Sequence, residues 1–165
     1  MNVFIIGTGL IGGSFAIDVH KAFPKAKIFG IDTNQNHLDE AAQLGVIHES
    51  ATFENLEIAD IVFLAIPVDS ALKVLPKVLD SIHDDTLVID AGSTKQQICE
   101  SVKNHSKRRN FLAAHPIAGT EFSGPKAAIL GLYNNKTNII CEVEKTAFKL
   151  QQKGLDIFSK LGMRI

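Results

Sequence analysis

The sequence predicts an α/β protein with a doubly wound, mostly parallel β-sheet and helices on both of its faces. Short apolar runs alternate along the chain with longer amphipathic segments that fit helices, which is the order expected of such a sheet. Several of these runs are continuously apolar, as in parallel strands that are buried on both faces. The crossovers between parallel strands are expected to be right-handed.

The first strand–helix–strand unit begins with the apolar run at residues 3–6, which leads directly into a glycine-rich turn, GTGLIGGS, at residues 7–14. A helix is expected to follow to about Ala22, and a second strand at residues 28–31 ends on Asp32. Strand, glycine turn, helix, strand and terminal acid is the order of a dinucleotide-binding unit. The sequence therefore predicts a fold of the Rossmann type.

Each glycine of this turn has a separate physical role. Gly7 allows the tight turn out of the strand, Gly9 lets the backbone approach a pyrophosphate, and Gly12 lets the helix lie against the sheet. The free N–H groups at the start of the helix then face the phosphates. The residues of this turn expected to bind the dinucleotide are Gly7, Thr8, Gly9, Leu10, Ile11 and Gly12.

Asp32 indicates which nicotinamide cofactor is bound. At the end of the second strand its carboxylate can accept hydrogen bonds from both ribose hydroxyls of an adenosine. A 2′-phosphate about 5 Å away would be repelled by roughly 3 kcal/mol at an effective dielectric near 20. Residues 33–36 contain no arginine to receive that phosphate. The predicted cofactor is therefore NAD rather than NADP.

The other elements are predicted from apolar periodicity. Gly45 is expected to end one helix, and Pro76 is expected to kink another or to begin a new helix. Strands are expected at residues 46–47, 61–66, 86–89, 111–114 and 137–141, and helices at residues 35–44, 68–82, 96–104, 126–132 and 145–160. In doubly wound sheets the ligand binds beyond the carboxyl ends of the strands. The informative residues are therefore those that directly follow each strand.

Length and composition narrow the function further. The 165 residues fit one domain, and a net charge of −1 gives no indication of nucleic acid or of an anionic membrane as a partner. The basic cluster at residues 107–109 is interpreted as a solvated turn. Cys99 and Cys141 lie far apart and suggest free thiols in a reducing compartment. With no leader-like segment and no apolar run of transmembrane length, the expected location is the cytoplasm.

A second stretch that is rich in candidate functional residues is HPIAGTEFSG, at residues 115–124. His115 leaves a core strand and is held by Pro116, and neutral imidazole can accept a proton near pH 7. The alternative is a histidine at a strand end that is bonded only to backbone, but Ser93 and Lys95 at a neighbouring strand end favour a catalytic function for His115.

Pro67 either borders the nicotinamide-side ribose or only terminates its strand. The sequence has no GxSxG elbow and no His, Cys, Asp or Glu residues at the spacing of metal ligands, so it supports neither a hydrolase nor a metal site.

Three segments together, GTGLIGGS at residues 7–14, DAGSTK at residues 90–95 and HPIAGTEFSG at residues 115–124, resemble the prephenate/arogenate dehydrogenase family of tyrosine biosynthesis. The similarity extends over the whole chain, and the histidine segment is the diagnostic one. The family oxidises the C4 carbinol of prephenate with NAD while carbon dioxide leaves C1, which gives 4-hydroxyphenylpyruvate. The resemblance implies that His115 binds and polarises the C4 hydroxyl.

The same resemblance suggests roles for three further residues. Ser93 would orient His115 or form a hydrogen bond near the nicotinamide and the substrate hydroxyl, and its alternative is an N-cap of the following helix. Lys95 would face a substrate carboxylate, or would be a solvated lysine of the first helical turn. Glu121 corresponds to an acidic residue near the mouth of the site, or is a surface charge on a loop.

Family members continue into a helical domain that forms a homodimer and supplies cationic residues for the substrate carboxylates. The present chain is expected to be the NAD-binding domain alone, residues 1–165, which would bind NAD but turn over prephenate weakly or not at all. Alternatives are an arogenate dehydrogenase, another NAD-dependent β-hydroxyacid or imino-acid dehydrogenase, and a nucleotide-binding module without catalysis. The sequence does not separate prephenate from arogenate as the substrate.

Overall fold

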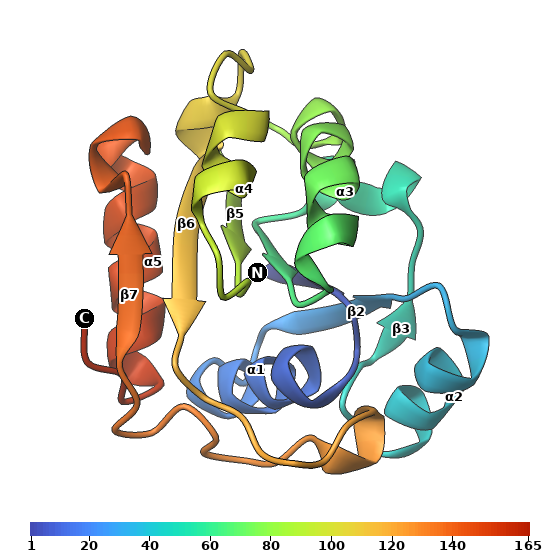
Figure 1. Ribbon diagram of the computed structural model, residues 1–165. Coiled ribbons are helices and arrows are strands. Elements are labelled where there is room, and N and C mark those ends of the chain that lie inside the picture. Colours follow the sequence, from blue (N-terminus) through green and yellow to red (C-terminus); the bar gives the residue numbers. More distant parts are fainter.

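A computed structural model describes all residues from Met1 to Ile165 as a seven-stranded sheet flanked by helices (Figure 1). The strand order is β3-β2-β1-β4-β5-β6-β7, and every neighbouring pair is parallel except β6 and β7. The predicted doubly wound, mostly parallel α/β fold is thereby confirmed. The order of the strands reverses between β1 and β4, which is the point where doubly wound sheets bind their ligands.

The strands are β1 (Asn2–Ile6), β2 (Lys27–Ile31), β3 (Glu49–Ser50), β4 (Ile61–Leu64), β5 (Leu87–Asp90), β6 (Phe111–Pro116) and β7 (Asn138–Cys141). The α-helices are α1 (Leu10–Ala22), α2 (Gln35–Gln43), α3 (Val68–Ser81), α4 (Gln96–Ser101) and α5 (Phe148–Lys160). Short 3-10 turns occupy η1 (Phe53–Ile58), η2 (Arg108–Asn110), η3 (Pro125–Ala127) and η4 (Val143–Lys145).

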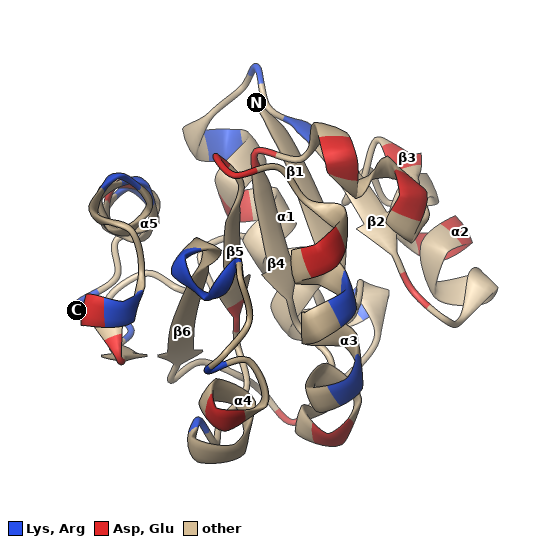
Figure 2. Cartoon of the chain, turned by 90° about the horizontal axis from the view of Figure 1, so that it is seen from above, with Lys and Arg blue, Asp and Glu red and all other residues tan.

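The sheet is buried on both faces because alternate residues of each central strand enter two separate apolar cores. Ile5 packs with α1 and α5 on one face, whereas its neighbour Phe4 packs with α3 and α4 on the other. Phe15 of α1 stacks on Phe63 of β4 with a ring-centroid separation of 3.8 Å. Strands β1 and β4 carry no charged side chain, and most Lys, Arg, Asp and Glu residues lie on helices and loops (Figure 2).

The register of the parallel strands aligns their carboxyl ends at one edge of the sheet. Ile6 pairs with Ile31 on one side and with Leu64 on the other, and Leu64 pairs in turn with Asp90. Asp90 then pairs with Ala113 of β6. The residues that follow these positions therefore lie together along this one edge of the sheet.

The segment between β6 and β7 crosses α1, reaches α2, and then returns to the sheet edge (Figure 1). Side chains of α1 fix it: Ser14 Oγ accepts a hydrogen bond from the Ile129 N–H at 3.0 Å, and Asp18 accepts one from the Gly131 N–H at 2.6 Å. The buried Tyr133 hydroxyl donates to the Ile11 carbonyl at 2.6 Å. These bonds join residues that are more than 110 positions apart in the chain.

The prediction of a helix at residues 126–132 is wrong, because this segment is bonded to α1. Only the 3-10 turn η3, Pro125–Ala127, forms there. The backbone N–H groups that a helix would use internally are donated to α1 instead. Tertiary hydrogen bonds have thus replaced the local ones.

The strand expected at residues 46–47 is also wrong. Gly45 has a φ of +69° at the end of α2, and the N–H groups of Val46 and Ile47 both donate to the Ala41 carbonyl. Val46 and Ile47 are therefore buried residues that cap the C-terminal end of α2. The edge strand β3 begins two residues later. The helix expected at residues 96–104 ends earlier, at Ser101.

The basic cluster at residues 107–109 is not a fully solvated turn. Arg108 is buried, donates to the Phe111 carbonyl at 2.9 Å, and pairs with Glu142 at 2.9 Å.

Helix α3 continues through Pro76 without a break, so no new helix starts at this residue.

Gly12 holds α1 against the sheet. A Cβ at this position would lie 2.0 Å from the Gly7 carbonyl oxygen and 2.8 Å from Cγ2 of Ile5. The first of these atoms belongs to the backbone of the glycine turn, so a rotamer change cannot relieve the contact.

We predict that Gly12→Ala lowers the free energy of unfolding by about 1–3 kcal/mol or more, because such overpacking forces backbone shifts. Urea denaturation followed by circular dichroism measures the effect. Gly119→Ala is the matched control, since a Cβ there meets nothing within 4 Å. Equal stability of the two variants would contradict the packing role of Gly12.

Candidate functional site

The glycine turn lies where β1 ends and α1 begins, and it is shaped for close approach by a ligand. Gly7 has a φ of +92°, and a Cβ there would lie 2.4 Å from the Ala65 carbonyl of the neighbouring strand end. A Cβ on Gly9 would meet nothing closer than the Gly124 nitrogen at 3.9 Å, so its backbone is open on that side. The first N–H groups of α1 have no intrahelical acceptor. The turn therefore presents free donors and a positive dipole end at the edge of the sheet.

Asp32 joins the turn to the end of β2. Its carboxylate accepts hydrogen bonds from the Thr8 N–H at 2.9 Å, from the Thr8 hydroxyl at 3.1 Å, and from the Asn34 N–H at 3.0 Å. Thr8 is fully buried, whereas the Asp32 side chain stays 12% exposed. A carboxylate has about four acceptor positions, so Asp32 retains capacity for hydroxyl groups of a ligand.

The environment of Asp32 favours its charged form. Burial raises the pKa of this carboxyl, but the hydrogen bonds from Asn34 and Thr8 outweigh that effect, and the resulting pKa lies below its usual value. His37 of α2 adds a weaker contribution, with its Nδ1 3.7 Å from the carboxylate. Asp32 is thus negatively charged throughout the physiological pH range.

The end of β5 supplies a buried ion pair that the sequence did not indicate. The Lys95 ammonium group pairs with the Asp90 carboxylate and also donates to the Ala114 carbonyl of β6 at 2.7 Å. The Asp90 side chain is 1% exposed and that of Lys95 only 11%. Burial raises the pKa of the Asp90 carboxyl, and the ammonium group of Lys95 opposes that shift.

Lys95 therefore differs from the solvated lysine considered as an alternative, and its expected contact with a substrate carboxylate stays a prediction. Ser93 is exposed and does not cap α4, which begins at Gln96 and has no side-chain cap. The capping alternative for Ser93 is thus ruled out. Its expected role near the cofactor and substrate stays a prediction.

His115 is the penultimate residue of β6 rather than the first residue after it. It is half-buried and, with Lys136, borders a hollow of about 310 Å³. The other lining residues are Pro116, Ile117, Ala118 and Gly119. Lys136 was not expected in the site, because no local pattern connects the start of β7 with the end of β6.

The glycine turn and His115 lie along the same edge of the sheet. Strands β1 and β6 are separated by β4 and β5, so three strand spacings of about 4.8 Å give about 14 Å between them. An extended dinucleotide is long enough to cover this distance. The expected spatial relation between the turn and the imidazole is therefore consistent with the structure.

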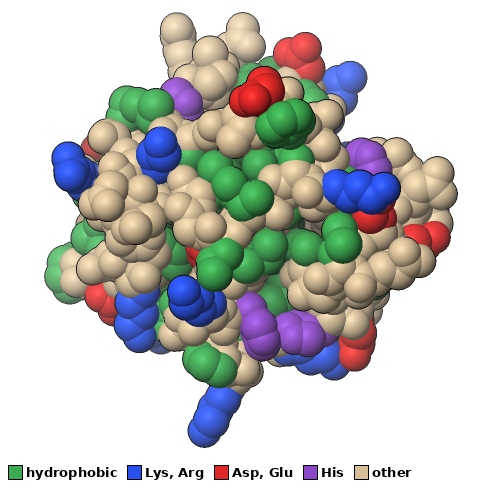
Figure 3. All heavy atoms as spheres, turned by 90° about the horizontal axis from the view of Figure 1, so that it is seen from below, with side chains coloured by type: hydrophobic (Ala, Val, Ile, Leu, Met, Phe, Trp, Pro, Cys, Tyr) green, Lys and Arg blue, Asp and Glu red, His purple; other side chains and the backbone are tan.

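The remaining expected residues lie on the surface around this edge. Pro67 directly precedes α3 and is exposed, and Glu121 is exposed in the loop after β6. In that same segment Ile117, Phe122 and Leu130 are 51%, 66% and 53% exposed. Hydrophobic side chains gather near the centre of the lower face of the molecule (Figure 3). The roles expected for Pro67 and Glu121 stay predictions.

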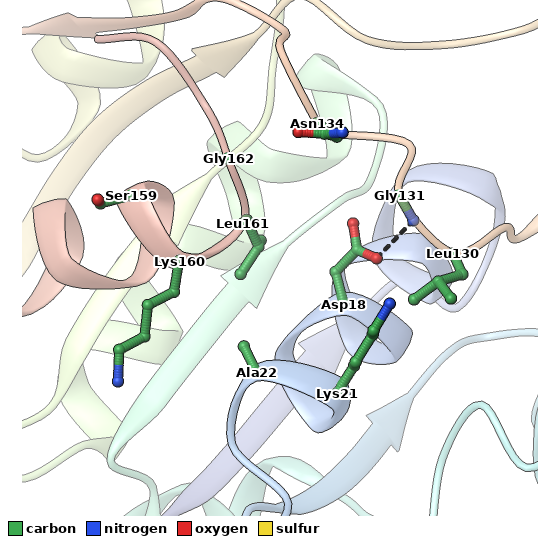
Figure 4. Close-up of a pocket in the computed structure, with 10 residues that line it drawn as sticks. All are labelled: Asp18, Lys21, Ala22, Leu130, Gly131, Asn134, Ser159, Lys160, Leu161 and Gly162. Carbon is green, nitrogen blue, oxygen red and sulfur yellow. Dashed lines mark hydrogen bonds between the residues drawn. The ribbon is translucent and has the colours of Figure 1, made fainter.

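A second hollow of about 370 Å³ lies between α1, α5 and residues 130–134, away from the glycine turn (Figure 4). Asp18 points toward the loop, and its hydrogen bond with the Gly131 N–H fixes that loop to α1. Burial raises the pKa of the Asp18 carboxyl, and bonds from the loop backbone oppose this. Asp18 therefore has a structural partner, and the hollow adds no reactive group to the candidate site.

A doubly wound sheet, a glycine turn at the start of α1 and an acid at the end of β2 define a dinucleotide-binding domain of the Rossmann type. The family described as "Prephenate dehydrogenase, nucleotide-binding domain" matches residues 15–165. The chain belongs to this family. Its members are named for the activity that the resemblance of the three sequence segments implied.

Known proteins agree with this assignment. A prephenate dehydrogenase from Lactococcus lactis subsp. cremoris is 34% identical over 93% of the chain. The crystal structure of prephenate dehydrogenase from A. aeolicus in complex with hydroxyphenyl propionate and NAD+ has a TM-score of 0.91 and 32% identity over 99% of the chain. Synechocystis arogenate dehydrogenase has a TM-score of 0.90 and 26% identity over the whole chain.

The chain spans only part of each of these proteins. It covers 44% of the Lactococcus enzyme and 58% of both the A. aeolicus and the Synechocystis chains. No helix of the structure is sufficiently long and apolar to cross a membrane.

We predict that Asp32→Asn lowers the free energy of unfolding by about 1 kcal/mol near neutral pH, because hydrogen bonds to a charged acceptor are lost. The folded-state pKa of Asp32 is below its unfolded value, so its stabilisation is complete above about pH 4 and is lost as the pH falls through the folded-state pKa. The difference between wild type and Asp32→Asn should therefore shrink in acid. Urea denaturation at several pH values measures it.

The exposed Asp156 on α5 provides the control, because Asp156→Asn should change stability little at any pH. A difference between wild type and Asp32→Asn that stays constant from neutral to strongly acidic pH would contradict the role of the ionised carboxylate.

Proposed function

We propose that the protein is a prephenate dehydrogenase, an NAD-dependent oxidoreductase that converts prephenate to 4-hydroxyphenylpyruvate with loss of carbon dioxide. The observation that carries the proposal is the alignment of the glycine turn, Asp32 and His115 along one sheet edge in a chain of this family. The chain would provide the cofactor site and the histidine that acts on the substrate.

The residues present fit NAD. The open backbone at Gly9 and the free N–H groups at the start of α1 would hold the pyrophosphate, and Asp32 would accept ribose hydroxyls. When bound, NAD supplies the acceptor for the hydride that leaves the substrate. The related A. aeolicus enzyme, whose crystal structure contains NAD+, supports the same choice.

His115 would act on the carbinol of the substrate. A neutral imidazole nitrogen accepts a hydrogen bond from the C4 hydroxyl, which raises electron density at C4 and favours departure of the hydride. The bond from C1 to its carboxylate breaks, and its electron pair enters the ring, which becomes aromatic. Ser93 is exposed at the neighbouring strand end and has its hydroxyl free for the substrate or for His115.

The substrate is identified less closely than the reaction. The similarity to both a prephenate and an arogenate dehydrogenase supports a cyclohexadienyl substrate of either kind, and prephenate is favoured by the higher identities.

Because the chain spans about half of these relatives, we infer that residues 1–165 alone bind NAD but turn over the substrate weakly. A homodimer is proposed for a protein of the relatives' full length. Both cysteines are unpaired, which supports the cytoplasm as the proposed location.

We predict that the chain binds NAD about a hundredfold more tightly than NADP, because the Asp32 carboxylate repels a 2′-phosphate by roughly 3 kcal/mol. Isothermal titration calorimetry measures both affinities. Asp32→Asn should narrow the ratio, since it removes the charge and keeps the shape. Equal affinities for the two cofactors in the wild type would contradict the role of Asp32.

We predict that His115→Asn reduces kcat for prephenate oxidation by about 10²–10⁴-fold, as expected on loss of a general acid–base group. Steady-state assays of NADH formation, in a protein that carries the complete catalytic unit, measure the rate. The affinity for NAD should change little. The exposed His83 provides the control, because His83→Asn should retain the wild-type rate.

An unchanged kcat in His115→Asn would instead favour a nucleotide-binding module in which this histidine has no catalytic function.

A further inference from the structure

We propose that the buried ion pair of Asp90 and Lys95 is a positioning device for His115. The proposal rests on the function proposed above for His115 and adds two residues to it, neither of which touches the reacting atoms. Both belong to the DAGSTK segment, which begins at the last residue of β5 and ends just before α4.

The pair binds both backbone groups of the residue that precedes His115. Asp90 Oδ1 accepts a hydrogen bond from the Ala114 N–H at 3.3 Å, and the Lys95 ammonium group donates to the Ala114 carbonyl at 2.7 Å. The Gly92 N–H also donates to Asp90, at 3.1 Å, and holds the carboxylate in place. The Ala114 carbonyl belongs to the peptide group that leads directly into His115.

These bonds take the place of a missing strand neighbour. The ladder between β5 and β6 ends at the pair of Asp90 and Ala113, whereas β6 continues for three more residues. Without the ion pair, the inward-facing N–H and carbonyl of Ala114 would have no partner from β5. An unpaired buried backbone group is costly, so the two side chains keep β6 regular up to the imidazole.

The orientation of His115 follows from this regular strand. Phe111 and Ala113 face the core beneath α3 and α4, and side chains alternate along a strand, so His115 points to that same face of the sheet. Asp90 and α4 lie on that face as well. A rotation of the Ala114 peptide would therefore move the imidazole relative to the sheet edge where the cofactor is expected.

The location and burial of the pair favour positioning over stability alone. A buried ion pair is often no more stabilising than apolar residues of the same volume. Here it follows from the end of β5 and bonds to the end of β6 that carries the proposed catalytic histidine, and two of the three ammonium donors are used on Asp90 and Ala114. A misplacement of about 1 Å in a catalytic group can lower a rate about a hundredfold.

The test compares Lys95→Met with Lys95→Arg and with the double variant Asp90→Asn/Lys95→Met. The double variant leaves no unpaired buried charge, so it keeps the test valid where Lys95→Met alone unfolds. Lys149→Met is the matched control, since it removes the same group from an exposed ion pair with Asp85.

The first readout is independent of turnover. In NMR spectra of the 165-residue chain, the His115 ring signals are assigned by their loss in His115→Asn. They should shift and broaden in Lys95→Met or the double variant, recover partly in Lys95→Arg, and stay unchanged in Lys149→Met. The second readout is kinetic: kcat should fall about tenfold to a hundredfold with KM and NAD affinity nearly unchanged.

Unmoved His115 signals in a folded variant without Lys95 would overturn the proposal. A rise in KM at constant kcat would overturn it too, because it would place Lys95 on the substrate. If the wild type does not oxidise prephenate but the His115 signals shift as expected, the proposed function fails while the positioning contact is upheld.

Discussion

The structure depends first on the register of the parallel strands. Backbone pairing sets Ile31, Ile6, Leu64, Asp90 and Ala113 level with one another, so every following residue emerges at a single edge. Backbone pairing alone is enough to bring residues that are far apart in the chain to this edge, and side-chain contacts such as that of Asp32 with Thr8 add to it. The glycine turn and the imidazole of His115 share one edge for this reason, and a shift of β6 by one residue would turn the histidine to the opposite face.

The edge is divided between two tasks. At β1 and β2, backbone N–H groups, the dipole of α1 and the Asp32 carboxylate are the groups proposed to bind a dinucleotide. At β5 and β6 the polar groups are Ser93, the buried ion pair and His115, of which His115 borders a hollow. The segment after β6 connects the two regions, because it crosses α1 and passes close to Gly9 at Gly124.

Sequence patterns revealed what depends on short-range geometry. The turn from Gly7 to Gly12 and the acid at Asp32 have fixed spacing within one βαβ unit, so their places at the ends of β1 and β2 could be predicted. The strand interiors could be predicted from apolar runs because both faces of the sheet are covered. His115 was found through its motif, and the register then placed it at the expected edge.

The features that the sequence did not reveal depend on contacts between distant residues. Ser14 and Asp18 receive N–H groups of Ile129 and Gly131, so a segment with helical periodicity is held as a loop. Lys95 has the pattern of a surface lysine in the first turn of a helix, and only the fold shows that Asp90 and Ala114 enclose it.

A crystal structure of the chain with NAD tests most directly whether the cofactor and His115 share one edge of the sheet. We expect the pyrophosphate on the glycine turn and the nicotinamide ring at the carboxyl ends of β4 and β5, on the side that faces His115. A nicotinamide ring directed away from β6, toward α2, would contradict it, because the histidine and the hydride acceptor would then not share a substrate.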